Sequence, residues 1–363
     1  MLKKLHKFCL RMARPDIMFY TLPWMMLLLI VGTVAQREIG IYQAERLFFS
    51  SWVLWVGIIP LPGGLLTLSL IFINLLAKFL FKSKWAWRQS GIILTHFGIL
   101  LLFIGALFTA TTAREGFVLI PEGRTSDKIQ DYHKKKLYIF ENEEEIASYS
   151  IQELQENDLR HKADLPFQIR VLTSCKNCEF LQAPKNDPDR RGLAQKIALK
   201  PIPPKKQNEA NLSGVTLKIS GTDQEDGVYV STEAAPHPIL IHKNGRDYRV
   251  QFQRMETKLP FELRLDDFVQ ELHPGTQMAK NYHSDVEVID GNDSWPVRIG
   301  MNAPLRNKGY TFFQSSFTNT PIGEATILAV VKNTGWLFPY IASIVIALGL
   351  LIHLGIRFQA RHE

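Results

Sequence analysis

The chain has 363 residues, of which 46% are apolar, and a formal net charge of +7. Its length exceeds one ordinary domain and falls short of three. Residues 1–112 carry a net charge of +8, whereas residues 113–334 carry −2. Because the basic residues flank long apolar runs, the pattern argues against nucleic-acid binding, which needs a basic stripe on a folded face, and it excludes a purely soluble enzyme.

Four apolar runs are long enough to cross a bilayer as helices, which takes about 20 residues. The alternative is a buried core helix, which rarely reaches this length without charge. The first run also resembles a signal peptide, but it is long for one and lacks a clear A-x-A cleavage site, so we interpret it as an anchor. We therefore expect a polytopic α-helical membrane protein with a membrane region at 1–112, a second at 335–363, and spans at about 17–35, 61–81, 91–110 and 336–356.

Lysine and arginine residues indicate the orientation of these spans. They cluster before the first run, between the second and third, and after the fourth, which places both termini on the cytoplasmic side of the inner membrane. Residues 113–334 then lie outside the cytoplasm. The clusters comprise Lys3, Lys4, Lys7, Arg11, Arg14, Lys82, Lys84, Arg88, Arg357 and Arg361.

The apolar segment 50–62 contains two tryptophans and is interrupted by Pro60 and Pro62. Tryptophan favours the boundary between lipid and water. We expect an interfacial helix leading into the second span, with a longer, kinked span as the alternative.

The insert 113–334 alternates apolar and polar residues in many short stretches, which predicts a β-rich domain, either a sandwich or an open barrel. Asn244-Gly245 separates two such stretches within 239–252, a strong hairpin signal. The polar, proline-containing stretches 182–195 and 201–206 are expected to be loops. Further strands are expected at 117–120, 137–140, 167–172, 215–219, 228–231, 261–268, 285–289, 297–299, 310–317 and 326–331.

Two histidines, His96 and His353, lie inside the third and fourth expected spans. An ionisable side chain is costly in hydrocarbon, so its presence indicates a function. At 1.5 Å per residue, both lie roughly 6–8 Å below the inner boundary. Neutral imidazole is a common axial ligand of haem iron, so both rings could face one haem. The alternatives are a hydrogen bond between helices or, for His353, a side chain that snorkels to the interface.

Cys175 and Cys178 form C-K-N-C in the insert, while Cys9 stands alone near the N-terminus. The pair is followed by Glu179 and not by histidine, so it is not a haem-attachment motif. An oxidising compartment favours a disulfide closing a turn, with a redox-active pair as the alternative.

The remaining candidates are weaker. No P-loop, G-x-G-x-x-G, G-x-S-x-G or H-E-x-x-H motif occurs, so a self-contained enzyme is not visible. The histidines of the insert show no metal-binding spacing: His133, His161, His237, His242, His273 and His283.

Several short motifs follow one another along the chain: GTV at 32–34, YQAE at 42–45, FSSW at 49–52, PLPGG at 60–64, GIILTHFGILLLFIG at 91–105, PGT at 274–276, MNAPL at 301–305 and GYTFFQSS at 309–316. In this order they resemble the ResB/CcsB family, the membrane subunit of the system II machinery of cytochrome c biogenesis. The resemblance covers nearly the whole chain, including its layout of three spans, an insert and one span.

The resemblance implies a partner of the CcsA/ResC type, a membrane protein with a tryptophan-rich external loop. Together the two proteins would carry haem b across the membrane and support its covalent attachment to C-x-x-C-H of apocytochrome c. The family's membrane ligand in this subunit corresponds to His96, and the other haem ligands belong to the partner. This chain would then be a non-catalytic or co-catalytic subunit of a cytochrome c haem lyase. Neither His353 nor the cysteine pair inherits a family role.

Two other functions are compatible with the residues alone. One is a membrane-anchored thiol-redox protein that uses Cys175 and Cys178. The other is a structural scaffold subunit that binds no cofactor.

Overall fold

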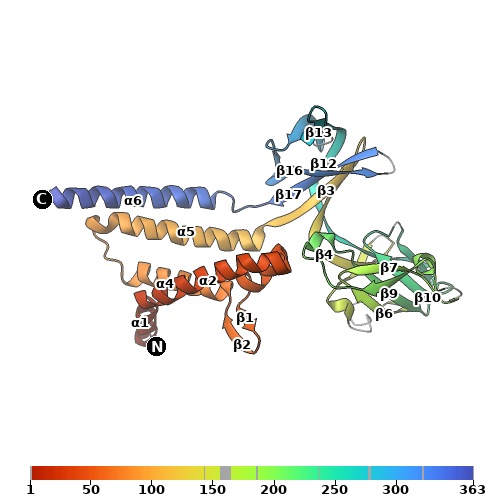
Figure 1. Cartoon of the computed structure of the whole chain (residues 1–363), viewed down its shortest axis with the longest axis horizontal. Helices are drawn as coiled ribbons and strands as arrows, with labels where there is room; N and C mark the ends of the chain where they lie inside the picture. The colour runs from red at the N-terminus through yellow and green to blue at the C-terminus, as the bar shows by residue number, and fades with distance from the viewer. Residues whose placement is uncertain are drawn as a thin grey trace. The chain divides into compact units, whose positions relative to one another are not determined.

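A computed structural model describes residues 2–142, 144–155, 165–184, 187–235, 237–276, 279–320 and 323–362. The chain divides into two compact units (Figure 1). The first comprises Met1–Arg114 and Lys332–Glu363, and the second Glu115–Val331. The first unit is mainly helical and the second is built from strands.

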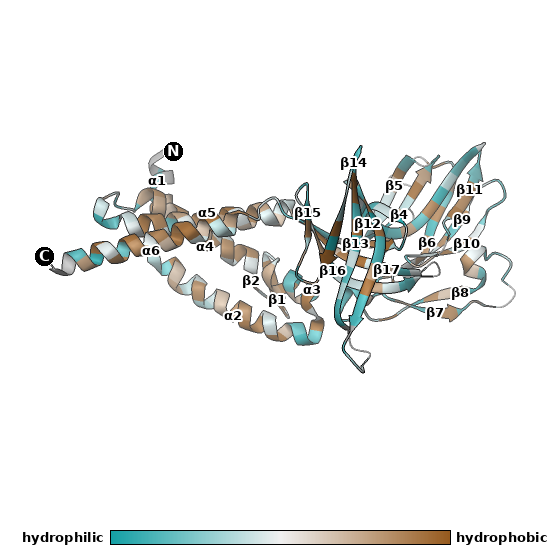
Figure 2. Cartoon of the chain, turned by 90° about the horizontal axis from the view of Figure 1, so that it is seen from above, coloured by the Kyte–Doolittle hydropathy of each residue, from teal (hydrophilic) through white to brown (hydrophobic). Residues whose placement is uncertain are grey.

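Four helices of the first unit are long and apolar enough to cross a membrane, and they make the chain a membrane protein. Each contains nearly all of one expected span: Leu61 to Gly63 precede the second helix, and Trp336 and Leu337 precede the fourth. The helices are α2 (Pro15–Ile39), α4 (Gly64–Phe81), α5 (Ser90–Thr112) and α6 (Phe338–His362). Figure 2 shows apolar residues along all four.

Shorter elements connect the long helices. An amphipathic helix, α1 (Leu2–Met12), precedes α2, and its polar face is rich in lysine. After α2 the chain forms α3 (Ile41–Ala44) and a π-helical turn, η1 (Glu45–Phe49). A 3₁₀ turn, η2 (Trp87–Gln89), precedes α5.

The prediction of an interfacial helix at 50–62 is wrong. The segment forms a β-hairpin in which β1 (Val53–Val56) pairs antiparallel with β2 (Ile59–Pro62). Gly57 provides the turn with a φ of 62°, in the left-handed region that glycine adopts without strain. Pro60 and Pro62 cannot donate helical hydrogen bonds, but they fit the outer edge of a strand.

The second unit contains one large sheet with the strand order β14-β13-β12-β4-β3-β17-β16-β15, to which β11 adds beside β12 and β5 beside β4. A three-stranded sheet, β10-β9-β6, and a pair, β7-β8, complete it. The strands are β3 (Arg114–Pro121), β4 (Thr125–Glu141), β5 (Glu144–Ser150), β6 (Gln168–Cys175), β7 (Cys178–Gln182), β8 (Ile197–Pro201), β9 (Gly214–Ser220), β10 (Gly227–Thr232), β11 (Ile239–Lys243), β12 (Arg246–Leu272), β13 (Ala279–Asp290), β14 (Asp293–Gly300), β15 (Leu305–Asn307), β16 (Tyr310–Thr320) and β17 (Gly323–Lys332).

The long strands β4 and β12 contribute to two separate hydrophobic cores. In the first, Ile139 and Phe252 of the large sheet pack with Leu217 of the three-stranded sheet, as in a sandwich. In the second, Leu263 of β12 packs with Phe312 of β16 and other residues of the large sheet. The expected β-rich domain is therefore present, with two cores.

The hairpin expected at Asn244-Gly245 is confirmed. β11 pairs with β12 as far as Lys243 opposite Arg246. The two turn residues have φ angles of 54° and 72°, the left-handed conformation of a two-residue turn that matches the strand twist.

Candidate functional site

Helices α5 and α6 pack at backbone contact along a stripe of glycines. Gly91, Gly98 and Gly105 recur every seven residues on α5. A Cβ atom added at Gly98 would lie 2.6 Å from Ile346 Cγ1, and one at Gly91 would overlap the backbone nitrogen of His353. Small residues permit such close approach between membrane helices, where dispersion contacts replace the hydrophobic effect.

His96 lies on a different side of α5 from this stripe. It is five residues after Gly91 and therefore about 140° around the helix. Phe103, seven residues after His96, lies on the same side as His96 and contacts Phe72 of α4, with ring centroids 5.7 Å apart. Next to His96, Phe97 stacks on Phe79 of α4 at 6.2 Å. These contacts show that the side of α5 that carries His96 faces α4.

The His96 ring is half-buried and forms no hydrogen bond within the part of the chain that the structure describes. No acidic side chain within these residues forms an ion pair with it. The alternative, in which His96 forms a hydrogen bond between helices, therefore finds no support among the described residues. A histidine nitrogen without a protein partner can act as a ligand to a metal centre.

His353 lies on the glycine side of the α5–α6 contact, since its backbone faces Gly91. Its Nδ1 atom is buried without a hydrogen-bond partner among the described residues, as is the hydroxyl oxygen of Ser90, which precedes Gly91. Because His96 lies about 140° away around α5, the helix geometry gives no support to two rings sharing one iron within this chain.

Sequence reasoning overlooked a buried amide on α4. Asn74 is 2% exposed, and its Nδ2 donates to the carbonyl oxygens of Met12 at 2.5 Å and Arg14 at 2.7 Å. These carbonyls lie where α1 ends and α2 begins, so the amide fixes that bend against α4. A polar residue in an otherwise apolar run was the signal that could have identified it.

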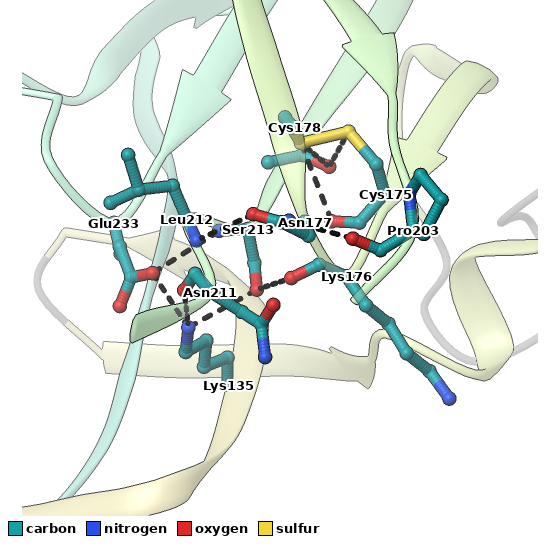
Figure 3. The surroundings of a disulfide bond; sticks show 11 residues. Lys135, Cys175, Lys176, Asn177, Cys178, Pro203, Asn211, Leu212, Ser213 and Glu233 are labelled. Carbon is teal, nitrogen blue, oxygen red and sulfur yellow. Dashed lines mark hydrogen bonds and ion pairs between the residues drawn. A yellow bond between two sulfur atoms is a disulfide. The ribbon is translucent and has the colours of Figure 1, made fainter. Parts of the chain in front are cut away.

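Cys175 and Cys178 are joined in a disulfide, and each is only 4% exposed (Figure 3). The Cys178 backbone N–H donates to the Leu212 carbonyl at 2.7 Å, and the Asn177 amide donates to the Pro203 carbonyl at 2.9 Å. The disulfide therefore closes a turn that these two hydrogen bonds fix to the neighbouring chain segments. Disulfide exchange requires a thiolate to reach one of the two sulfur atoms, and the burial of both cysteines prevents that.

A buried lysine lies beside this turn (Figure 3). Lys135 Nζ donates to Glu233 Oε1 at 2.6 Å, to the Asn211 carbonyl at 2.7 Å and to Ser213 Oγ at 3.1 Å. Arg254 Nη2 lies 2.9 Å from the other oxygen of Glu233. Burial lowers the pKa of Lys135, although the bond to Glu233 opposes that shift.

The described histidines of the insert do not gather at one place. His133 Nδ1 lies 2.8 Å from the Asn208 amide, and His242 Nδ1 lies 3.0 Å from Glu225. His237 and His273 are exposed, whereas His283 is buried; His161 lies outside the described residues. Among the residues that the structure describes, no three of His, Cys, Asp and Glu gather as metal ligands.

Residues 239–339 match the ResB-like family, from β11 to the start of α6. Protein NrfI of Wolinella succinogenes is 34% identical over 101 residues, which cover 27% of this chain. The matched segment spans only 11% of the length of NrfI. The family match includes neither His96 nor His353.

Proposed function

Because the chain belongs to the ResB-like family, we propose that it acts in cytochrome c biogenesis, as a membrane subunit of the complex that carries haem b across the membrane and supports its attachment to apocytochrome c. The family match and the relative NrfI support the general role. The positions of His96 and of the helices support the specific one. The partners in this proposal are a CcsA/ResC-type membrane protein and apocytochrome c.

The proposal places the protein in the inner membrane with both termini in the cytoplasm. The clusters of lysine and arginine at the ends of the helices support that orientation. In it, the β-rich unit is extracytoplasmic, and His96 is near the cytoplasmic leaflet. In this orientation the subunit has a histidine on the side from which haem would enter the membrane and a folded domain on the side where apocytochrome c would bind.

A single observation carries the haem proposal: the His96 ring sits in a membrane-crossing helix without a hydrogen bond or an acidic partner among the described residues. A histidine in hydrocarbon costs free energy, and a ligand role accounts for that cost. Haem, when bound, would supply an iron that a neutral imidazole nitrogen can hold. In this chain His96 would hold it, and the partner would supply the other protein ligand.

His353 is the weaker candidate. Its Nδ1 atom also lacks a hydrogen-bond partner among the described residues, but its backbone packs against Gly91 in the α5–α6 contact. We therefore propose that His353 does not share the iron with His96. A thiol-redox function finds no support from the buried disulfide, so the scaffold function is the alternative that an experiment must distinguish.

The test compares His96→Ala with His353→Ala in the protein purified with its membrane partners. We expect His96→Ala to lose most of the bound haem by absorption spectroscopy and added imidazole to restore part of it. His353→Ala should retain haem and serves as a matched control, because it also removes an imidazole from a membrane helix. Equal amounts of protein in the membrane would exclude misfolding.

Two outcomes would contradict different parts of the proposal. Unchanged haem in His96→Ala would remove the ligand role and leave the scaffold. Normal c-type cytochromes in cells that lack the chain, detected by covalent haem staining, would remove the role in biogenesis itself.

A further inference from the structure

The β1–β2 hairpin exposes apolar side chains on both faces and at its tip. Trp55 is 62% exposed, Ile58 93% and Ile59 57%, whereas Leu54 is buried against the rest of the unit. The chain carries no charge between Arg46 and Lys78. A two-stranded hairpin is marginally stable at best in water, so an apolar environment around the exposed side chains would stabilise this one.

The edge of β2 is closed to further strand pairing. Gly63 N–H donates to the Trp52 carbonyl at 3.0 Å, which sets the alternation of hydrogen-bonded pairs along the hairpin. Pro60 and Pro62 therefore occupy the positions whose N–H groups would point outward, and they have none. The outward carbonyl of Pro62 accepts the indole N–H of Trp24 on α2 at 2.9 Å. A partner strand cannot add to such an edge.

The length of α4 indicates the depth of the hairpin. β2 leads directly into α4, which has 18 residues and is about 27 Å long. The opposite end of α4 is followed by Lys82, on the cytoplasmic side in the proposed orientation. Since the hydrocarbon core is about 30 Å thick, the hairpin lies near the outer boundary of the bilayer. Figure 1 shows it projecting sideways from the helices, across their long axes.

Lipid fits this surface better than a protein does. A protein surface would cover one side of the hairpin and leave the rest in water, whereas exposed apolar side chains lie on both faces and at the tip. The outward N–H groups of Val53 and Trp55 on β1 still need water or headgroups, which excludes the middle of the hydrocarbon. Tryptophan also favours the boundary between acyl chains and headgroups.

We propose that the tip of the hairpin, from Val56 to Ile59, inserts into the outer leaflet at the boundary between acyl chains and headgroups. It anchors the entrance of α4 laterally, beside the bundle. The proposal rests on the membrane placement of the helices and is independent of haem binding.

The test uses the full chain in nanodiscs of phosphatidylethanolamine and phosphatidylglycerol. A nitroxide label is attached to Ile58→Cys in a Cys9→Ser background, because Cys9 is the free cysteine among the described residues. Collisions with oxygen, which concentrates in lipid, are compared with collisions with a water-soluble nickel chelate. Controls are Ile104→Cys on α5, which is 49% exposed, and Arg37→Cys at the polar end of α2.

We expect the ratio of oxygen to nickel collisions at position 58 to exceed that at position 37 several-fold. A ratio equal to that at position 37 would place the tip in water and overturn the proposal. An immobilised label shielded from both reagents would indicate a protein surface over the tip and would also overturn it. A water-like ratio at position 104 would instead contradict the membrane placement of the helices.

A second measurement does not depend on labelling. Brominated lipids should quench part of the tryptophan fluorescence of the wild-type chain, and Trp55→Phe should remove part of the quenched signal. Quenching that is unchanged in Trp55→Phe would contradict insertion of the hairpin.

Discussion

Gly91 on α5 faces the backbone of His353 on α6, with no space for a side chain between them. A Cβ atom at Gly91 would overlap the backbone nitrogen of His353 and lie 2.6 Å from the carbonyl oxygen of Gly349. Both contacts are with backbone atoms, which cannot rotate away. The third and fourth spans are therefore held together at the cytoplasmic end in the proposed orientation, close to the level of His96.

Gly91→Ala should separate α5 from α6 at this point. Overpacking of a tight contact costs about 1–3 kcal/mol, so we expect a lower thermal midpoint of the purified protein. Gly355→Ala is the matched control: it is on the same helix as His353, and no atom of the described residues lies within 4 Å of a Cβ atom there. Equal midpoints for the two variants would show that the contact at Gly91 relaxes without cost.

The membrane helices were predictable because length and lack of charge dominate their signal. The contact between α5 and α6 was not predicted, although Gly91, Gly98 and Gly105 stand at a seven-residue spacing in the sequence. The spacing identifies a face of the helix, but the partner of that face depends on tertiary packing. The same holds for Asn74, whose two acceptors are about 60 residues away.

Two strand regions show why some of the strands were not predicted from the sequence. β4 begins at Thr125, but only 137–140 was expected, because residues 125–136 are mostly polar and bury few side chains between the two cores. The hairpin at 53–62 was missed because apolar residues without alternation do not distinguish a helix from a strand. By contrast, Asn244-Gly245 identified its hairpin because the turn itself requires those residues.

Lys135→Met should destabilise the β-rich unit. The side chains of Lys135 and Glu233 are 6% and 9% exposed. The substitution leaves the buried carboxylate with Arg254 and the Ser213 backbone N–H but removes its ammonium partner. Removing one partner of a buried pair costs about 3 kcal/mol. Pulse proteolysis in urea of the full chain would measure the free energy of unfolding of this unit.

Lys134→Met is the matched control for that experiment, since the Lys134 side chain is 68% exposed. Surface substitutions of this kind usually change stability by less than about 0.5 kcal/mol. Similar effects of the two variants would mean that the buried pair contributes nothing specific.

Replacing both Cys175 and Cys178 by alanine should affect stability and leave cytochrome c maturation intact. A crosslink that closes a loop of four residues contributes about 2 kcal/mol in the chain-entropy account. The same urea experiment would measure the loss, and covalent haem staining would measure maturation. Loss of maturation at normal protein levels would restore the thiol-redox function as a candidate.

The pair of Asp285 and Arg298 should make the β-rich unit sensitive to acid. Arg298 donates to both carboxylate oxygens, at 2.7 and 2.9 Å, and these bonds hold the pKa of Asp285 below its ordinary value. A carboxyl whose pKa is lower in the folded state stabilises the fold fully above the unfolded value of about 3.9. That stabilisation is lost as the pH falls through the lower, folded-state pKa.

Asp285→Asn removes this titration, so the variant should be less stable than the wild type at pH 7 and approach it as the pH falls through the folded-state pKa of Asp285. Urea unfolding measured by proteolysis over a series of pH values from 7 into acid would follow the difference. Other carboxylates titrate equally in the two proteins, so the difference isolates Asp285. A gap between the proteins that stays constant with pH would show that Asp285 contributes through packing and not through its charge.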